Sequence, residues 1–541
     1  MSELTAAAQL KNEGNELYKK QDFVGALVKY SDALALDDKN AVPYANRAAC
    51  SHGLNKYLDA ADDAQLVLMQ CHIYAWAIPD YAKGWSRLAA AWDALADWRN
   101  SADAWQKALN ALPTTNLSPA QRQQRDQYRA SLKAAQARIE ATKKPIVPLF
   151  KINAKEGKFP WQVAAEMLTE LWNIKNISSS AWVIAYAYQE FTTGVNKMKE
   201  LKLHAQGPEE FGCYGSTDAL AHLTNGMLRD DRAFHIDQPD WISMYNKQVM
   251  FEATARHAWD SEGLETIKEQ AQKRLKEKGW SDIRPALSVT VRAWIMRASL
   301  DGSVRQKPHS AVQHLKRALD LLEWGRTIWK DFPKSDRGTI FEDTFVAGVR
   351  ALYLKTFMNA YSTDPGLNSK FPLEHLKEEA EDLVKETDRV LQNPTKEQVD
   401  PGFFLSFTSY PAGIAYSMIG LYHVQMAQYG SDPMEGMFSF IKGYLDAASK
   451  YPEDDESHAW FLNSALDCMR HARVRIGDFN QVAVRLQEAA PKMMKIWALS
   501  SLAKVDRDQR IRANLDNARD IMKRVTEGKL TLDDPVPSLL S

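Results

Sequence analysis

The N-terminal part of the chain repeats itself with a period of 34 residues. Gly14, Ala48 and Ala89 occur in equivalent sequence contexts, separated first by 34 residues and then by 41, which is one period plus seven residues. A period of this length is typical of stacked helical hairpins, in which each unit buries its apolar face against its neighbours. The repeat therefore predicts three helical hairpins in series over residues 1–115.

The second helix of each hairpin carries a pair of residues spaced four apart. These pairs are Ala26 with Tyr30, Ala60 with Ala64, and Ser101 with Trp105. Small residues let antiparallel helices approach closely, and an aromatic one turn later fills the seam between hairpins. The second repeat is the weakest match, because it has alanine where the others have an aromatic. An apolar insertion around Leu68–Ile78 supplies the seven extra residues, and we expect it to lengthen a helix or to pack as a bulge.

The composition changes after Pro113. Between Pro113 and Pro160 there are ten Lys or Arg residues and three acids, a local charge of +7. Ser118 followed by Pro119 is a typical helix start, so we expect a polar helix to about residue 142 that caps the open end of the stack. Three prolines and a glycine in residues 143–160 indicate a linker. Residues 116–160 are thus predicted to be a basic capping helix and linker.

The remaining residues, 161–541, show helical periodicity with few alternating, strand-like windows. Apolar residues recur at spacings of three and four in Trp161–Trp172, Ala181–Leu201, Ala311–Trp329, Phe341–Tyr361, Leu373–Leu391, Gly413–Gln428, Phe438–Lys450, Ser457–Arg473 and Gln481–Leu502. The fold class is therefore predicted to be all-α. It comprises the repeat superhelix and a large α-solenoid-like helical domain in which no fixed period emerges.

Composition excludes several classes of protein. The 541 residues carry 68 Lys plus Arg against 69 Asp plus Glu, a net charge of -1, so no specific nucleic-acid binding is expected. The four cysteines are Cys50, Cys71, Cys213 and Cys468. They are too widely spaced for a disulfide or zinc framework and are interpreted as reduced thiols. Because the first 21 residues are rich in charge, we expect no secretory signal and a cytoplasmic location.

One uncharged stretch is long enough to span a bilayer. Residues 401–430 contain no Asp, Glu, Lys or Arg, which leaves a membrane span as one interpretation. Polar residues interrupt the stretch throughout. We therefore favour a buried helix pair broken at Tyr410–Pro411 and expect no membrane association.

Five polar residues fall on one stripe of the first helix when the three repeats are overlaid. In first-repeat numbering, Lys83 falls at position 8, Lys11 at 11, Asn46 and Arg87 at 12, and Asn15 at 15. This series follows the i, i+3, i+4, i+7 pattern of one helix face, so stacking the first helices should align the five side chains along one surface, the concave one.

The stripe contains three cations and two amides but no acid, although residues 1–115 are acidic as a whole. Lys and Arg supply charge-assisted donors, and Asn amides orient an oxygen. Together they suit a ligand with two neighbouring carboxylates, such as a chain end whose last residue is Asp. The alternative is an ordinary solvated repeat surface, which the exclusion of acids disfavours.

At these residues the sequence resembles a known family. The segments KNEGN (11–15), YANRAA (44–49) and YAKGWSR (81–87) are similar to the two-carboxylate clamp of tetratricopeptide-repeat (TPR) co-chaperones. The resemblance covers about residues 5–115. It implies that Lys11, Asn15, Asn46, Lys83 and Arg87 grip the C-terminal Glu-Glu-Val-Asp tail of heat-shock protein 70 or 90. The insertion between Asn46 and Lys83 departs from the family pattern and could tilt the third repeat.

Other polar clusters carry weaker signals. Asp230, Asp231, His235, Asp237 and Asp240 could in principle ligate a metal, but their spacing fits no ligand motif; we interpret them as a polar loop between helices. The acids of Glu453–Glu456 precede a helix, whose positive N-terminal end explains them. No cofactor or metal site and no catalytic residue are predicted.

The sequence thus predicts a non-enzymatic cytoplasmic adaptor. Its TPR clamp would hold a heat-shock protein tail while residues 161–541 bind an unidentified client or partner. Two alternatives remain open: a scaffold that uses the repeats for an unrelated acidic peptide, and an enzyme whose helical domain hides an active site without a linear motif.

Overall fold

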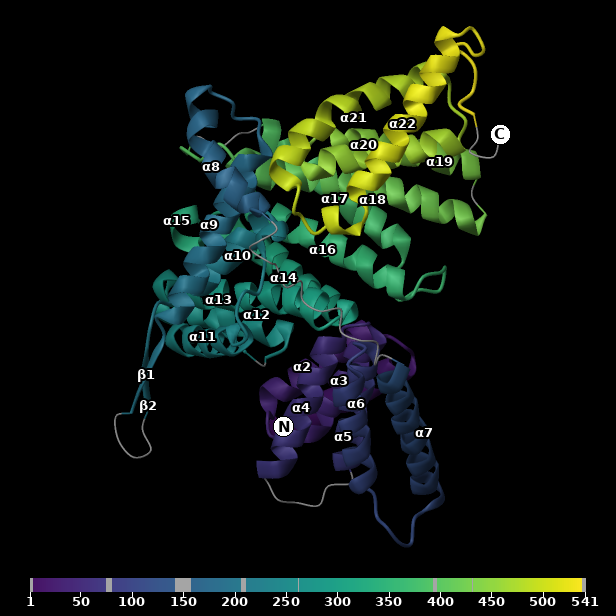
Figure 1. Ribbon diagram of the computed structural model, residues 1–541. Helices are drawn as coiled ribbons and strands as arrows, with labels where there is room; N and C mark the ends of the chain where they lie inside the picture. The colour runs from purple at the N-terminus through teal and green to yellow at the C-terminus, as the bar shows by residue number, and fades with distance from the viewer. Residues whose placement is uncertain are drawn as a thin grey trace. The chain divides into compact units, whose positions relative to one another are not determined.

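The computed structural model describes residues 3–73, 80–141, 157–205, 211–260, 262–392, 397–430 and 432–537. It divides into two compact units. Unit 1 comprises Met1–Lys151, Trp259–Gly279 and Arg297–Arg317. Unit 2 comprises Ile152–Ala258, Trp280–Met296 and Ala318–Ser541. Figure 1 shows that the described residues of both are almost entirely helical, which confirms the all-α prediction.

The N-terminal part of unit 1 consists of three helical hairpins and one further helix. The helices are α1 (Glu3–Lys19), α2 (Phe23–Leu36), α3 (Ala41–Gly53), α4 (Tyr57–Ile73), α5 (Asp80–Ala94), α6 (Trp98–Asn110) and α7 (Pro119–Ala141). Each helix packs against the next in the sequence, and α3 also contacts α1 and α5. Unit 1 therefore has the predicted TPR arrangement of three hairpins followed by a capping helix.

The backbone repeats with the same spacing as the sequence. The turn inside each hairpin contains one residue with positive φ: Gln21 (62°), Asn55 (59°) and Ala96 (56°). These residues are 34 and then 41 positions apart, as Gly14, Ala48 and Ala89 are. Because a non-glycine residue rarely adopts this conformation, its recurrence shows that the three hairpins are built alike.

Close packing at Gly14 joins the first two helices. A Cβ atom at this position would lie 2.7 Å from Cε1 of Tyr30, so only glycine lets the ring of Tyr30 lie against α1. Tyr30 is 1% exposed and packs with Ala26 and Cys50. The small residue Ala26 and the aromatic Tyr30, which the repeat pairs in sequence, therefore pack together in the structure.

Two further predictions in unit 1 can be compared with the structure. Ser118 and Gln121 exchange side-chain to backbone hydrogen bonds at the start of α7, as expected of a helix cap. Helix α4 continues to Ile73, so the first part of the insertion at Leu68–Ile78 lengthens that helix. Residues 74–79, and residues 142–156 of the expected linker, lie outside the described residues.

Unit 1 also includes three later helical segments. These are α12 (Leu264–Lys278), the π-helical turn η2 (Leu300–Val304), and the start of α14 (Pro308–Ile328). Arg317 on α14 donates to Asp59 (2.6 Å) and Asp62 (2.8 Å) on α4. Burial and the neighbouring acid Asp59 act against the attraction of Arg317 and raise the pKa of Asp62 to about 7.

Unit 2 begins with helices that the sequence predicted only in part. Its elements up to residue 341 are α8 (Pro160–Asn173), α9 (Ser180–Lys199), β1 (Lys202–Ala205), β2 (Phe211–Tyr214), α10 (Ala219–Arg229), η1 (Asp231–Ala233), α11 (Trp241–Arg256), α13 (Trp280–Ser299), the remainder of α14, α15 (Lys334–Arg337) and η3 (Thr339–Phe341). Strands β1 and β2 form an antiparallel hairpin that pairs Lys202 with Tyr214. Residues 202–299 contain strands and helices that periodicity did not reveal.

The second half of unit 2 is a series of helices packed in sequence order. They are α16 (Asp343–Thr363), α17 (Leu373–Gln392), the π-helical turn η4 (Leu405–Ser409), α18 (Tyr410–Met426), η5 (Ala427–Tyr429), α19 (Pro433–Ala448), α20 (Glu456–His471), α21 (Ile476–Trp497), η6 (Ala503–Val505) and α22 (Arg507–Thr526). From α16 to α22, each α-helix contacts the next. This serial packing is solenoid-like, as predicted.

The predicted helix break at Tyr410–Pro411 is wrong. The π-helical turn η4 runs directly into α18, and Ser409 and Tyr410 both have helical backbone angles. Proline lacks an N–H group and normally disrupts a helix. Here it lies at the start of α18, directly after a wider turn in which the hydrogen-bond register changes. Among the described residues, no helix combines the length and the apolar character needed to cross a membrane.

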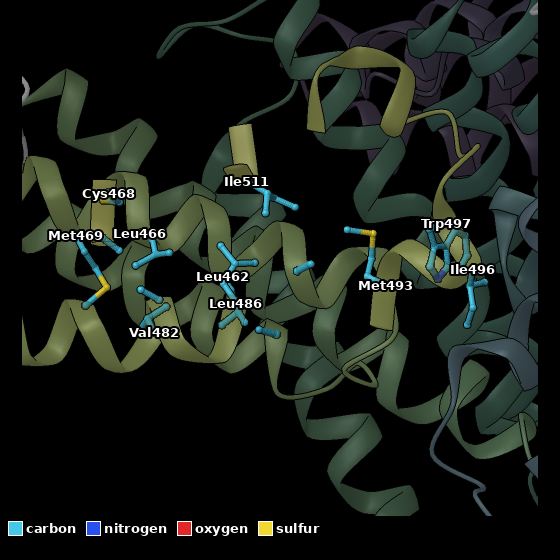
Figure 2. Close-up of a cluster of buried hydrophobic side chains, with 14 of the residues drawn as sticks. Leu462, Leu466, Cys468, Met469, Val482, Leu486, Met493, Ile496, Trp497 and Ile511 are labelled. Carbon is cyan, nitrogen blue, oxygen red and sulfur yellow. The ribbon is translucent and has the colours of Figure 1, made fainter. Parts of the chain in front are cut away.

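A large apolar core joins α20, α21 and α22 to α8 and α9. Figure 2 shows Leu462 and Leu466 of α20 beside Val482 and Leu486 of α21, with Ile511 of α22 nearby. Leu486 is fully buried, whereas Val484 on the same helix is 44% exposed. The apolar face of α21 therefore points into the core and its neighbouring residues face solvent.

Truncation of Leu486 tests this core. We expect Leu486→Ala to lower the free energy of unfolding of unit 2 by about 2–5 kcal/mol, because it removes buried methyl groups and leaves a cavity. Val484→Ala, the matched control on the same helix, should change it by less than about 0.5 kcal/mol. Urea denaturation followed by circular dichroism measures both; equal effects would contradict the burial of Leu486.

Candidate functional site

The five stripe residues lie on the first helices of the three hairpins. Lys11 and Asn15 lie on α1, Asn46 on α3, and Lys83 and Arg87 on α5. Because α3 contacts both α1 and α5, these helices are neighbours in the stack. Lys83 is exposed and the other four side chains are partly buried. The cations are thus within reach of solvent while their helices are fixed by packing.

Asn15 and Asn46 are in direct contact. The Asn46 side chain donates from Nδ2 to Oδ1 of Asn15 at 3.0 Å. The Tyr30 hydroxyl donates to the same oxygen at 2.8 Å. Two donors therefore fix the orientation of the Asn15 amide, and its Nδ2 group is directed away from them. An amide held in this way offers N–H donors to a ligand without first having to rotate.

Tyr30 is not one of the five stripe residues. It lies on α2, the second helix of its hairpin, where the repeat pattern predicts only a packing aromatic. Burial raises its pKa to about 12, although the nearby Arg87 acts in the opposite direction. The hydroxyl therefore remains protonated at neutral pH and keeps donating to Asn15. The sequence signal for this role is the hydroxyl of Tyr30, which a phenylalanine at the same position would lack.

Arg87 has an unused hydrogen-bond donor. Its Nε atom is buried and has no hydrogen-bond partner among the described residues. Arg87 also interacts electrostatically with Tyr30 and with Cys50 on α3, which places its charge near the hydrogen-bonded pair Asn15–Asn46. A buried donor without a partner costs free energy unless a ligand or water accepts from it.

The acids near the stripe are paired with cations elsewhere. Glu13 pairs with Lys29 (2.8 Å) and Glu16 with Lys19 (2.7 Å). Arg47, next to Asn46 in the sequence, donates to the buried Asp63 on α4 at 2.7 Å. Arg47 therefore has a structural role within the second hairpin.

The predicted polar loop at residues 230–240 is part of an ion-pair network in unit 2. Asp231 pairs with Lys355 (2.6 Å), Asp230 accepts from Arg232 (2.9 Å), and the ring of His235 stacks on Trp161 (4.9 Å between centroids). Asp237 and Asp240 are exposed. Across the part of the chain that the structure describes, no three metal-ligating side chains come together as a metal site.

The acids before α20 join the same network. Asp455 caps α20 by accepting from the backbone N–H of Ser457 (2.7 Å), as predicted, and it also accepts from Arg232 (2.9 Å) and Tyr410 (2.6 Å). Burial acts to raise the pKa of Asp455, but the Arg232 guanidinium holds that pKa below its ordinary value. Helix capping therefore explains only part of the role of Asp455, because its other partners, Arg232 and Tyr410, come from segments distant in the sequence.

Comparison with known proteins gives matches to the N-terminal segment. No protein-family model matches the chain. The segment is 36% identical over 103 residues to the heat shock protein sti1 homolog of Schizosaccharomyces pombe, covering 19% of this chain and 16% of that protein. It is 36% identical over 108 residues to the Hsp70-Hsp90 organizing protein of Triticum aestivum, covering 20% and 17%. The resemblance to TPR co-chaperones is confirmed.

A third relative is the heat-shock protein cognate co-chaperone sgt12 of Aspergillus fumigatus, which is 31% identical over 103 residues and covered to 28% of its length. Among solved structures, the Sgt2 TPR domain from Aspergillus fumigatus is 25% identical, with a TM-score of 0.22, over 28% of this chain and 94% of that one. The matched segment thus spans less than a third of each of these curated relatives, and the similarity concerns the TPR part alone.

The buried environment beside the stripe can be tested through its cysteine. Burial raises the pKa of Cys50 to about 12, so at pH 8 only about one thiol in ten thousand is the reactive thiolate. We expect iodoacetamide to modify the exposed Cys213 within minutes and Cys50 only after unit 1 unfolds. Peptide mass spectrometry measures both; rapid modification of Cys50 in the native protein would contradict this environment.

Proposed function

We propose that the TPR part of unit 1 binds the C-terminal tail of heat-shock protein 70 or 90. In this proposal Lys11, Asn15, Asn46, Lys83 and Arg87 hold the terminal carboxylate and the Asp side chain of a Glu-Glu-Val-Asp tail. The chain acts as a non-enzymatic co-chaperone and adaptor in the cytoplasm, and the helical domain that follows residue 160 binds a client or partner.

The observation that supports the proposal is the combination of three cations and an oriented amide pair on α1, α3 and α5 with one unused donor on Arg87. Three cations and an oriented amide pair lie on neighbouring helices, and the Nε donor of Arg87 is buried without a partner among the described residues. Each charge-assisted hydrogen bond contributes roughly 1.5–3 kcal/mol. A few such bonds with modest apolar contacts reach about -8 kcal/mol, which corresponds to a micromolar Kd suited to reversible binding.

The similar proteins support the same role. Those with matching N-terminal segments are described as a heat shock protein sti1 homolog, an Hsp70-Hsp90 organizing protein and a heat-shock protein cognate co-chaperone. These descriptions favour a chaperone tail over an unrelated acidic peptide as the ligand, and a co-chaperone over an enzyme. The partner of unit 2 has no counterpart in the matched segments, and its identity has to come from experiment.

The chemistry of the chain end is the first test. A peptide ending in Glu-Glu-Val-Asp should bind the full-length protein with micromolar affinity and bind at least about tenfold more weakly when its C-terminus is amidated, because one carboxylate and its charge-assisted bonds are lost. Raising the salt concentration should weaken the acid peptide further. Isothermal titration calorimetry measures the affinity of the acid peptide, of the amidated peptide, and of the acid peptide at raised salt concentration. Equal affinity of the acid and amide peptides would refute the clamp.

Substitution of the stripe residues is the second test. Lys11→Ala and Arg87→Ala should each weaken peptide binding by about ten- to a hundredfold, since each removes a charge-assisted contact. Lys20→Ala and Arg99→Ala remove the same charges from exposed positions off the stripe and should leave the affinity within about twofold. If affinity purification with the Arg87→Ala protein recovered chaperones normally but lost other partners, the repeats would instead serve the scaffold function.

A further inference from the structure

Unit 2 contains a cavity that no part of the clamp explains. Its volume is about 220 Å³, and it lies among α10, α16, α18, α19 and α20. The π-helical turn η4 borders it through Ser406, and α18 contributes Tyr410, Ser417 and Met418. A π-helical turn within a longer helix is a frequent feature of ligand sites, so the composition of the walls decides what this cavity suits.

The walls are mainly apolar and aromatic. Aliphatic and thioether groups come from α10 and α18, and aromatic rings come from α19 and α20; the residues concerned are Met227, Leu228, Ile414, Met418, Leu421, Tyr444 and Phe461. The rings of Tyr444 and Phe461 lie 5.2 Å apart at an edge-to-face angle of 83°. Aromatic rings and methionine sulfur both interact favourably with a further aromatic ring placed between them.

The charged side chains at the cavity are already neutralised. Lys355 pairs with Asp231 (2.6 Å), Arg229 pairs with Asp400 through two hydrogen bonds (2.7 and 2.8 Å), and Arg232 pairs with Asp230 and Asp455. A charged guest would have to break one of these pairs and lose part of its own hydration, both of which cost free energy. The walls therefore favour an uncharged guest.

Two serines leave hydrogen-bond acceptors at the cavity wall. The Ser406 hydroxyl donates to the carbonyl of Gly402 (2.8 Å) and the Ser417 hydroxyl to the carbonyl of Ile414 (2.7 Å). Both side chains are almost fully buried. With their protons committed to the helix, the hydroxyl oxygens retain lone pairs that accept from a donor. A guest with one N–H or O–H group would donate to one of them.

We infer that this cavity binds a single uncharged aromatic ring system that carries one hydrogen-bond donor, of the size of indole. An apolar cavity of about 150 Å³ accommodates benzene, so 220 Å³ has room for two fused rings. The ring belongs either to a free small molecule or to a tryptophan side chain of a bound protein segment. The inference does not depend on the proposed clamp, because the clamp residues lie in unit 1 and the cavity in unit 2.

The test uses the full-length protein and three probes. Indole should bind in isothermal titration calorimetry with a Kd below about 1 mM and should raise the Tm of unit 2. Indene has the same shape but no N–H group and should bind more weakly. N-acetyltryptophanamide presents the ring on a peptide backbone: its binding assigns the site to a protein segment, and its exclusion while indole binds assigns the site to a free small molecule.

Two variants make the test specific. Ala351→Leu places a larger side chain at the cavity wall and should weaken indole binding at least about tenfold by filling the space. Asn359→Leu adds the same side chain at an exposed position of α16 and should not weaken indole binding.

If Ala351→Leu does not fold, the double variant Ser406→Ala, Ser417→Ala decides: it should weaken indole binding by about two- to tenfold and leave indene binding unchanged. No binding of indole to the wild type, or equal effects of the serine variant on both probes, would overturn the inference.

Discussion

The close approach of α1 and α2 at Gly14 is the contact on which the candidate clamp depends. Because Gly14 has no Cβ atom, the ring of Tyr30 lies against α1, and the Tyr30 hydroxyl reaches Oδ1 of the adjacent residue, Asn15. That oxygen also receives the hydrogen bond from Asn46 on α3. One packing contact inside the first hairpin therefore orients an amide that two hairpins share, and it links the repeat architecture to the geometry of the stripe.

Sequence periodicity predicted the three N-terminal hairpins well, because the information that specifies them is local and repeated. Gly14 and Tyr30 belong to one repeat, and the 34-residue spacing transfers their arrangement to the others. The positive-φ residues recur at the same spacing. The role of Tyr30 was harder to predict, since its hydrogen bond joins two helices that meet only after folding. The stripe residues could be assigned to helices from sequence, whereas their contacts with one another required coordinates.

Unit 2 shows why the rest could not be predicted. Arg232 binds Asp455, which is 223 positions away, and a single sequence contains no signal for such a pair. The acids before α20 therefore appeared to be only a helix cap. Pro411 was misinterpreted for a related reason: a π-helical turn before it lets the helix continue, and this turn depends on hydrogen-bond register rather than residue type. Helices α10 to α13 were not predicted individually, although Leu220, Leu223 and Met227 of α10 are buried at spacings of three and four.

Charged side chains have different roles in the candidate clamp and in the ion-pair network of unit 2. In unit 2 the acid partners neutralise Arg232 within the fold, and the cation stacks 3.9 Å from the ring centre of Trp497, so its charge contributes to structure. On α1, Glu13 pairs with Lys29 and Glu16 with Lys19. Of the three stripe cations, Lys11 lies on α1 and Lys83 and Arg87 on α5, and the buried Nε atom of Arg87 has no hydrogen-bond partner among the described residues. A buried donor without a partner costs free energy, so an anionic ligand that accepted a hydrogen bond from Arg87 would bind more tightly because it removed a cost already present in the unbound repeat stack.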